Sequence, residues 1–390
     1  MNAQSKISAN THQIASAYIP LAEFRRAARL MAQVVPRWNV IPVLGYVRVT
    51  IGHGRVSLCA TDLDIELTIN VDADTAFEGE TAVMIRATTL ASFATAARSV
   101  VNISAHAPAG EDTPSLILMD GGDMVVRQRA LIPTGDFPQF SASTVKTATW
   151  TQTPDELRRM IYLCRHCISA EETRYYLNGI YLHARPDGST LRAVATDGYR
   201  LAVVDTDTQI SAIVGQTLSA IIPKQLVDLL KLVTRPGDNA PLTVTMWERH
   251  VHIHGLDIEV SAKLIDGHYP EYSRVIPAAS DAICCTISGA ELTRLQRAAA
   301  GADYDAHIAR LDASKGMICI GNQDGGIEMP IGIKCKDGMT PPVFGFNLRY
   351  LAEQGRVTPT FTVKGASCRD PFIIHGDDPD AMFVLMPARV

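Results

Sequence analysis

The chain has 390 residues, which is too long for a single hydrophobic core, so two or three domains are expected. Hydrophobic residues make up 47% and charged residues 20%, and no apolar run reaches the roughly 18–20 residues of a membrane-spanning helix, which excludes that class of membrane protein. The formal net charge of −5 argues mildly against nucleic-acid binding unless the basic residues gather on one surface.

The N-terminus and the cysteines indicate the compartment. Residues 1–16 are polar and lack the apolar core of a signal peptide, so they are expected to form a disordered leader. Eight cysteines scattered through a chain of this size favour a reducing compartment over a disulfide framework. Cys164 and Cys167 fall in an apolar helical pattern and are expected to be small core residues. A cytoplasmic protein is therefore predicted.

The predicted elements follow one order three times along the chain. In the first round, apolar periodicity and turn residues predict helix 20–34, strands 40–44, 46–51, 56–60 and 66–71, helix 87–99 and hairpin 116–126. The second round has a helix from 153, strands 179–183 and 191–195, helix 223–234 and hairpin 242–254. The third has a helix from 288, strands within 309–333, helix 347–354 and strands 360–363, 371–374 and 383–386. Helices mixed with hairpins, without regular alternation, predict the α+β class.

Short motifs recur at nearly one spacing. The pattern of glutamate, an apolar residue, any residue and arginine begins at Glu23, Glu156 and Glu291, in steps of 133 and 135 residues. The triplet ATD occurs at 60–62 and again at 195–197. Several independent matches at one period indicate internal repetition. We therefore predict three similar domains, with two helices and many short strands in each, over residues 17–143, 144–278 and 279–390.

The predicted helices are more basic than the rest of the chain. Twelve basic and six acidic side chains fall in or beside them, although the whole chain is negative. A positive helix layer on an otherwise acidic protein suits a surface that receives a polyanion. Arginines on solvated outer helix faces explain the same count, so both interpretations stay open on composition alone.

Five stretches point to one family. They are TRYYLNG at 173–179, ATDGYRL at 195–201, KLIDGHYPEY at 263–272, IPVL at 41–44 and MPARV at 386–390. Through these motifs the chain, from about residue 17 to its end, closely resembles the bacterial sliding clamp, the beta subunit of DNA polymerase III. The resemblance implies three repeated DNA clamp domains, and a head-to-tail dimer that forms a six-domain ring around double-stranded DNA. It also implies a processivity factor without catalytic activity or cofactor, which tethers the replicative polymerase and the clamp loader through short apolar peptides.

The resemblance further implies a peptide-binding pocket between the second and third domains. Apolar side chains would supply the cleft, and arginine and asparagine at its edge would hold peptide backbone or a carboxylate. Taken singly, each of these residues is equally consistent with ordinary core. By position they are Leu177, Thr196, Gly198, Tyr199, Arg200, Leu201, Pro270, Arg274, Val275, Asn347, Tyr350, Val384, Leu385, Met386, Pro387, Ala388 and Arg389.

Paired tyrosines contact DNA in this family, and aromatic faces near a helix–strand junction suit stacking on bases or bonding to phosphate. Buried hydroxyl groups are the alternative. Trp38 takes the place where the family often has an arginine before IPVL, so the neighbouring Arg37 becomes the candidate there. The expected DNA-binding residues are Arg37, Glu171, Tyr175, Tyr176, Arg26, Arg159 and Arg294.

Three features depart from the family pattern. Tyr199 replaces a frequent histidine, and Ala388 stands where a larger residue is common, so a reshaped pocket is expected. Ala300 and Gly301 fall where the subunit interface often has bulky apolar residues, which predicts a weaker or differently specific dimer. Together they suggest a divergent copy. The alternative function is a non-loading paralogue that acts as a peptide-binding decoy or an inhibitor-resistant duplicate.

An enzyme is disfavoured by the motifs. The sequence has neither a phosphate-binding glycine-rich loop nor a Gly-x-Ser-x-Gly nucleophile motif. His250, His252 and His254 alternate along a predicted strand, which places three imidazoles on one face, where they could bind a metal. No acidic or cysteine cluster completes that site in the sequence, and a solvent-facing hairpin edge explains the pattern equally. No metal site is therefore predicted.

Overall fold

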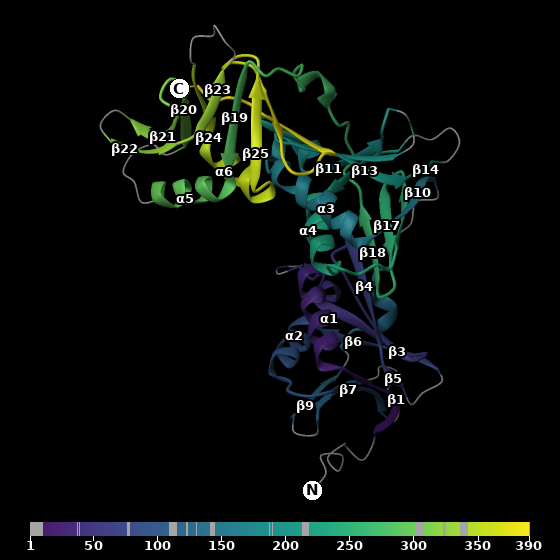
Figure 1. Ribbon diagram of the computed structural model, residues 1–390. Helices are drawn as coiled ribbons and strands as arrows, with labels where there is room; N and C mark the ends of the chain where they lie inside the picture. The colour runs from purple at the N-terminus through teal and green to yellow at the C-terminus, as the bar shows by residue number, and fades with distance from the viewer. Residues whose placement is uncertain are drawn as a thin grey trace. The chain divides into compact units, whose positions relative to one another are not determined.

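The computed structural model describes residues 11–36, 38, 40–75, 79–108, 115–121, 124–129, 131–140, 145–186, 188, 190–212, 218–300, 307–322, 325–335 and 342–389 (Figure 1). The chain forms two compact units. Unit 1 comprises residues 1–155 and 228–264, and unit 2 comprises residues 156–227 and 265–390. The chain passes from one unit to the other three times: within helix α3 (Pro154–Cys164), within helix α4 (Lys224–Val233) and after residue 264.

Unit 1 places helices α1 (Leu21–Val34) and α2 (Ala87–Ala96) against antiparallel sheets. One sheet has the order β5 (Asp74–Thr75), β1 (Thr11–Ile19), β7 (Val101–Pro108), β8 (Ser115–Asp120) and β9 (Met124–Arg129). The other runs through β10 (Lys146–Gln152), β16 (Leu242–Trp247), β17 (His250–His254), β18 (Ile258–Lys263), β4 (Ile65–Asp72), β3 (Arg55–Thr61), β2 (Tyr46–Gly52) and β6 (Glu80–Arg86). Its short 3-10 helices are η2 (Pro42–Gly45) and η3 (Thr134–Asp136).

Unit 2 carries helices α5 (Gly289–Ala299) and α6 (Leu348–Val357), which pack on each other. Its larger sheet has the order β15 (Ser219–Pro223), β11 (Gly179–Ala184), β12 (Thr190–Thr196), β13 (Arg200–Gln209), β27 (Ala381–Leu385), β26 (Phe372–His375), β25 (Thr360–Gly365), β19 (Ile283–Ser288) and β23 (Gly332–Cys335). The smaller sheet has the order β22 (Gly325–Pro330), β21 (Met317–Asn322), β20 (Ile308–Asp312) and β24 (Val343–Asn347). The short elements are β14 (Ser211–Ala212), η4 (Arg165–Cys167), η5 (Glu172–Leu177) and η6 (Tyr272–Val275).

The six predicted helices are confirmed, as is the α+β class. Polar caps begin two of them: Ser288 Oγ accepts the Glu291 N–H at 3.4 Å, and Asn347 Oδ1 accepts the Arg349 N–H at 3.0 Å. The apolar stripe of α1 is buried, with Phe24 packed edge-on against Phe93 of α2 at 5.8 Å between ring centres. None of the helices in the described ranges combines the length and the apolar character that crossing a membrane requires.

Two predictions about the N-terminal part are wrong. Residues 11–16, expected in a disordered leader, belong to β1, which pairs with β7 along its length. Ala15 and Ala17 alternate into the core at 2% and 0% exposure, and such small residues give no apolar signal in the sequence. Residues 40–44, expected to be a strand, include the 3-10 helix η2, where Pro42 lacks the N–H that a strand ladder needs.

The ATD triplet at 195–197 forms a tight turn between β12 and β13. Thr196 Oγ1 donates to the carbonyl of Arg200 at 2.6 Å, and Asp197 Oδ1 accepts the N–H of Arg200 at 3.0 Å. Gly198, between them, has φ of +89°, a left-handed conformation that glycine adopts without a steric cost.

The earlier triplet at 60–62 makes the same turn between β3 and β4. Thr61 Oγ1 donates to the carbonyl of Ile65 at 2.9 Å, and Asp62 Oδ1 accepts the N–H of Ile65 at 2.7 Å. Here Leu63 occupies the left-handed position, with φ of +78°. The internal repeat in the sequence thus has a counterpart in hydrogen bonding, and the first copy carries backbone strain that the second lacks.

Opposite substitutions in the two turns are expected to change stability in opposite directions. Gly198→Ala should lower the free energy of unfolding by about 1–2 kcal/mol, because a Cβ atom disfavours the left-handed conformation. Leu63→Gly should raise it by up to about 1 kcal/mol, the relief of strain less the greater freedom of glycine in the unfolded chain. Chemical denaturation followed by circular dichroism measures both. Leu63→Ala is the control, since it shortens the side chain and keeps the strain; an equal gain from alanine would contradict the explanation.

Candidate functional site

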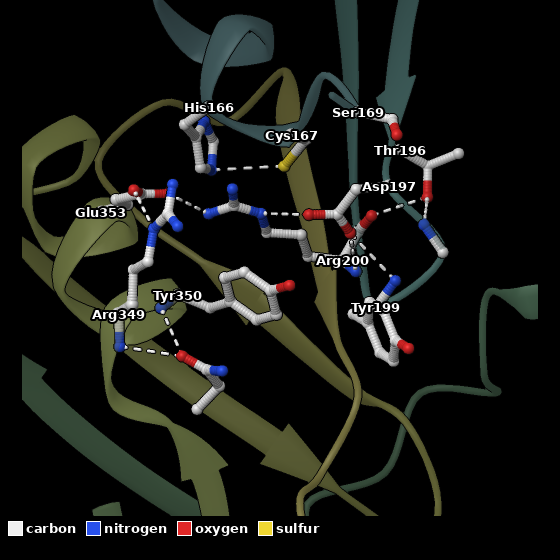
Figure 2. Close-up of polar contacts among 12 residues, drawn as sticks. His166, Cys167, Ser169, Thr196, Asp197, Tyr199, Arg200, Arg349, Tyr350 and Glu353 are labelled. Atoms are coloured by element: carbon white, nitrogen blue, oxygen red, sulfur yellow. Dashed lines mark hydrogen bonds and ion pairs between the residues drawn. The ribbon is translucent and has the colours of Figure 1, made fainter. Parts of the chain in front are cut away.

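Arg200, at the start of β13, has only 8% of its side chain exposed. Its Nε donates to Asp197 Oδ2 at 2.9 Å, and its Nη1 donates to Glu353 Oε2 at 2.6 Å, as Figure 2 shows. A guanidinium group is planar and presents its donors in a fixed fork, so it can link two carboxylates at once. Arg200 therefore joins the turn before β13 to helix α6.

Helix α6 also places the ring of Tyr350 against this guanidinium (Figure 2). The Cζ atom of Arg200 lies 4.3 Å from the centre of the Tyr350 ring, within cation–π range. Burial alone would raise the pKa of Glu353, but hydrogen bonds from Arg349 and Arg200 outweigh it and lower that pKa. Glu353 is therefore ionised at neutral pH. It was not among the predicted site residues, because it lies 153 positions from Arg200 in the sequence.

His166 and Cys167 complete the cluster (Figure 2). His166 Nε2 lies 3.0 Å from Gln354 Oε1, and Cys167 Sγ lies 3.3 Å from the same nitrogen. Burial, assisted by the positive charge of Arg200, lowers the pKa of His166 to about 4. Burial also raises the pKa of Cys167 well above its usual value. Both groups are neutral at pH 7, and the expectation that Cys167 is a core residue is confirmed.

The low pKa of His166 predicts a loss of stability in acid. The unfolded chain takes up a proton near the ordinary histidine pKa of 6.5, whereas the folded protein does so only near 4. The contribution of His166 is thus complete above pH 6.5 and falls between pH 6.5 and 4, by ~2 kcal/mol at pH 5. We expect His166→Gln to remove this component when denaturation curves of both proteins are compared at pH 7.5 and pH 5. Parallel pH dependence in the variant would contradict a neutral, buried His166.

A core cluster lies under the β13–β27 pair. Leu201 and Val384 face each other in the strand register and are buried together with Leu177 and Tyr269. The chain continues from β27 along the turn, where the Met386 N–H donates to the Tyr199 carbonyl at 2.8 Å. Tyr199 and Met386 are nevertheless exposed, by 58% and 38%. Large exposed apolar groups that lie next to each other are typical of interaction sites.

Unit 2 contains every predicted pocket residue. Val275, 51% exposed, ends η6 beside Ile276, which packs on the core cluster of Leu177, Leu201, Val384 and Tyr269. The buried members of the predicted pocket are Leu177, Arg200, Leu201, Val384 and Leu385. The exposed or half-buried members are Thr196, Gly198, Tyr199, Pro270, Arg274, Val275, Asn347, Tyr350, Met386, Pro387, Ala388 and Arg389. The first set is buried and the second reaches the surface, and the assignment of a pocket to these residues stays a prediction.

The predicted DNA-binding residues occupy different environments. Tyr175 is exposed, whereas Tyr176 packs against the core cluster, and their rings lie edge to face at 5.8 Å. Glu171 is exposed and pairs with Arg174 at 3.2 Å. Arg294 lies exposed on α5, and Arg37 lies outside the described residues. The exposed members of this set remain candidates for DNA contact.

Two of the predicted DNA-binding arginines are engaged by carboxylates. Arg26 Nη1 donates to Asp257 Oδ2 at 2.7 Å within unit 1. Arg159 donates from Nε and Nη2 to the two oxygens of Asp378, both at 2.6 Å, within unit 2. The hydrogen bonds from Arg159 lower the pKa of Asp378, so this ion pair is present at neutral pH. Both arginines therefore hold parts of their own unit together.

The predicted interface residues are only partly described. Ala300 follows the last turn of α5, where its N–H donates to the Gln296 carbonyl at 3.1 Å, and its side chain is exposed. Gly301 lies outside the described residues. An exposed helix end with a small side chain is available for contact with another chain, and the interface remains a prediction.

Comparisons with known proteins agree with one another. The family model of the DNA polymerase III beta subunit, central domain, matches residues 152–271. The beta sliding clamp of Caulobacter vibrioides is 31% identical over 384 residues, covering 94% of this chain and 98% of that protein. A DnaN sliding clamp from Bartonella birtlesii bound to griselimycin is similar with a TM-score of 0.83 and 26% identity, covering 97% of this chain and 100% of that one. The C. crescentus beta sliding clamp with bound PEG is similar with a TM-score of 0.82 and 27% identity, covering 98% and 100%.

Proposed function

This chain belongs to the bacterial beta sliding clamp family, and because it is a DNA sliding clamp, we propose that two copies close head to tail into a ring that encircles double-stranded DNA. The ring holds DNA without reading its sequence and keeps a replicative polymerase at high effective concentration on the template. It catalyses no reaction and acts in the cytoplasm. The observation that carries the proposal is the match to a sliding clamp over 94% of this chain and 98% of that relative.

A six-domain ring requires three domains per subunit, and several observations support that number. The helices come in three pairs along the chain, α1 with α2, α3 with α4 and α5 with α6. The pairing of β4 with β18 recurs as the pairing of β13 with β27, and β4 and β13 each follow one of the two equivalent turns. The central-domain family match at 152–271 falls inside the second predicted domain.

The charge of the helices supports DNA in the ring. In the part of the chain that the structure describes, helices α1 to α6 carry eleven arginine and lysine residues and six aspartate and glutamate residues, while the net charge of the whole chain is −5. Exposed members such as Arg29, Arg294 and Arg297 suit diffuse phosphate contacts, which permit sliding because they prefer no single register. Arg26 and Arg159 contribute through the ion pairs that fix their helices.

The surface around Tyr199, Val275 and Met386 is the docking site for short apolar peptides of the polymerase and the clamp loader. These exposed apolar side chains lie next to buried core residues and near the ion-paired Arg200. They would therefore lose little conformational freedom when an apolar peptide binds to them. The related clamp bound to griselimycin supports a ligand site on this fold. The comparisons give no support to the alternative of a non-loading decoy, since the relatives named are sliding clamps.

Topological retention tests the ring. The protein is loaded with its clamp loader and ATP onto a nicked circular plasmid, and the complex is separated from free protein by gel filtration. We expect retention on the circle and loss after one restriction cut, because a ring slides off an open end. Retention that is equal on circular and linear DNA would overturn encirclement. Sedimentation over a concentration series shows in parallel whether the 42.3 kDa chain forms a dimer.

A further inference from the structure

Two histidines and a glutamate gather on one hairpin of unit 1. His252 and His254 alternate along β17, and β18 pairs with it so that Glu259 stands opposite His254 and Ser261 opposite His252. Strand residues two apart share a face, and directly opposed residues share it too. The three side chains each offer one ligand atom, and these atoms lie within 4.8 Å of one another. The sequence predicts no metal site, because Glu259 becomes a neighbour only when the hairpin closes.

The backbone beneath these groups is firmly set. β17 lies between β16 and β18, so it is not the edge strand that its sequence pattern allows. Val251 and Ile253 point to the opposite face and are 1% and 3% exposed. A slip of one residue would bury the histidines and expose these apolar groups, so the register is strongly specified. The two imidazoles therefore stay on the accessible face at a fixed spacing.

The local hydrogen bonds prepare the side chains for a metal. His252 Nδ1 lies 3.0 Å from Ser261 Oγ, and when Nδ1 donates to this hydroxyl, Nε2 presents its lone pair. His254 Nδ1 lies 4.0 Å from Glu259 Oε1. The third histidine is different: His250 is buried and stacks on Trp247 at 4.5 Å between ring centres.

We propose that His252, His254 and Glu259 form a binding site for one Zn²⁺ ion, with the remaining coordination position taken by water. Two imidazoles and a carboxylate are an established ligand set for zinc. Bonds of about 2.0–2.1 Å in a tetrahedral site place ligand atoms about 3.3 Å apart, so the observed spacing must contract modestly. His254 and Glu259 are exposed enough to make that rotation without disturbing the core.

A zinc ion here would join β17 to β18. Because β18 also pairs with β4, with Glu259 opposite Thr68, the ion would brace the strand that connects the second predicted domain to the first. The site contains none of the residues assigned to DNA or peptide binding. A test of zinc binding is therefore independent of whether the protein forms the proposed ring.

Isothermal titration of untagged, chelator-treated protein with ZnCl₂ tests the site. We expect one Zn²⁺ per chain, and binding that is at least about tenfold weaker in His254→Ala and in Glu259→Gln. His375→Ala is the matched control, since it removes an exposed histidine from β26, and it should bind as the original protein does. Co²⁺ is a second probe: a site with protein ligands changes its visible absorption, and His254→Ala should abolish that change.

Two results would overturn the proposal. One is the absence of saturable Zn²⁺ binding in the micromolar range. The other is binding that neither His254→Ala nor Glu259→Gln weakens, which would place the ion elsewhere on the chain. Circular dichroism of each variant tests whether the fold is retained. Glu259→Gln also preserves the size of the side chain, so that a loss of binding by a folded variant is attributable to the lost ligand.

Discussion

Replacing Arg200 by methionine is expected to lower the free energy of unfolding of unit 2 by about 3–5 kcal/mol. Methionine fills much of the same volume, but it leaves Asp197 and Glu353 without the cation that links them at 2.9 and 2.6 Å. It also removes the cation over the Tyr350 ring. Asp197 keeps its backbone hydrogen bonds and Glu353 keeps Arg349, which limits the loss to this range.

The measurement must report on unit 2. All three tryptophans, Trp38, Trp150 and Trp247, lie in unit 1, so intrinsic tryptophan fluorescence would miss the change. Hydrogen exchange of the amides of β13 and α6, read by mass spectrometry, reports it directly. Glu353→Gln is the control, because it keeps a hydrogen-bond acceptor for Arg200 and should cost less. Unchanged protection in Arg200→Met would contradict the structural role assigned to this ion pair.

Met386→Asp is expected to weaken binding of a clamp-binding peptide at least about 100-fold, because an unpaired carboxylate would be desolvated under an apolar ligand. The dimer should be unaffected, since this position belongs to the proposed peptide site and the backbone bond from its N–H to Tyr199 remains possible. Fluorescence anisotropy with a labelled peptide measures the affinity.

Two controls make that result specific. Met386→Leu keeps an apolar surface and should bind within a few-fold of the original affinity. Leu131→Asp adds the same charge at an exposed leucine of unit 1, and it should leave peptide binding unchanged. Undiminished binding by Met386→Asp would mean that the peptide site is placed wrongly. It would not contradict the ring, which the retention of the protein on circular DNA tests separately.

The features that can be predicted from the sequence are local or periodic. The turn at 195–197 is held by bonds between residues within four positions of one another, so its type can be read from Thr, Asp and Gly in order. The six helices follow from apolar spacing and caps, and the three rounds follow from motifs at one period. The family follows from motifs of four to ten residues. Long-range packing is not needed for any of these inferences.

Which charged groups and which possible metal ligands come into contact depends on long-range packing. The arginines of the predicted helices suggest a surface for DNA. However, Arg26 is hydrogen-bonded to Asp257, 231 positions away in the sequence, and Arg159 is hydrogen-bonded to Asp378, 219 positions away. Arg200 similarly finds Glu353 in another predicted domain. Glu259 reaches His254 only through the strand register. The physical reason is shared: an ionic or metal contact acts over a few ångströms, and the sequence separation of its partners is set by sheet pairing and packing.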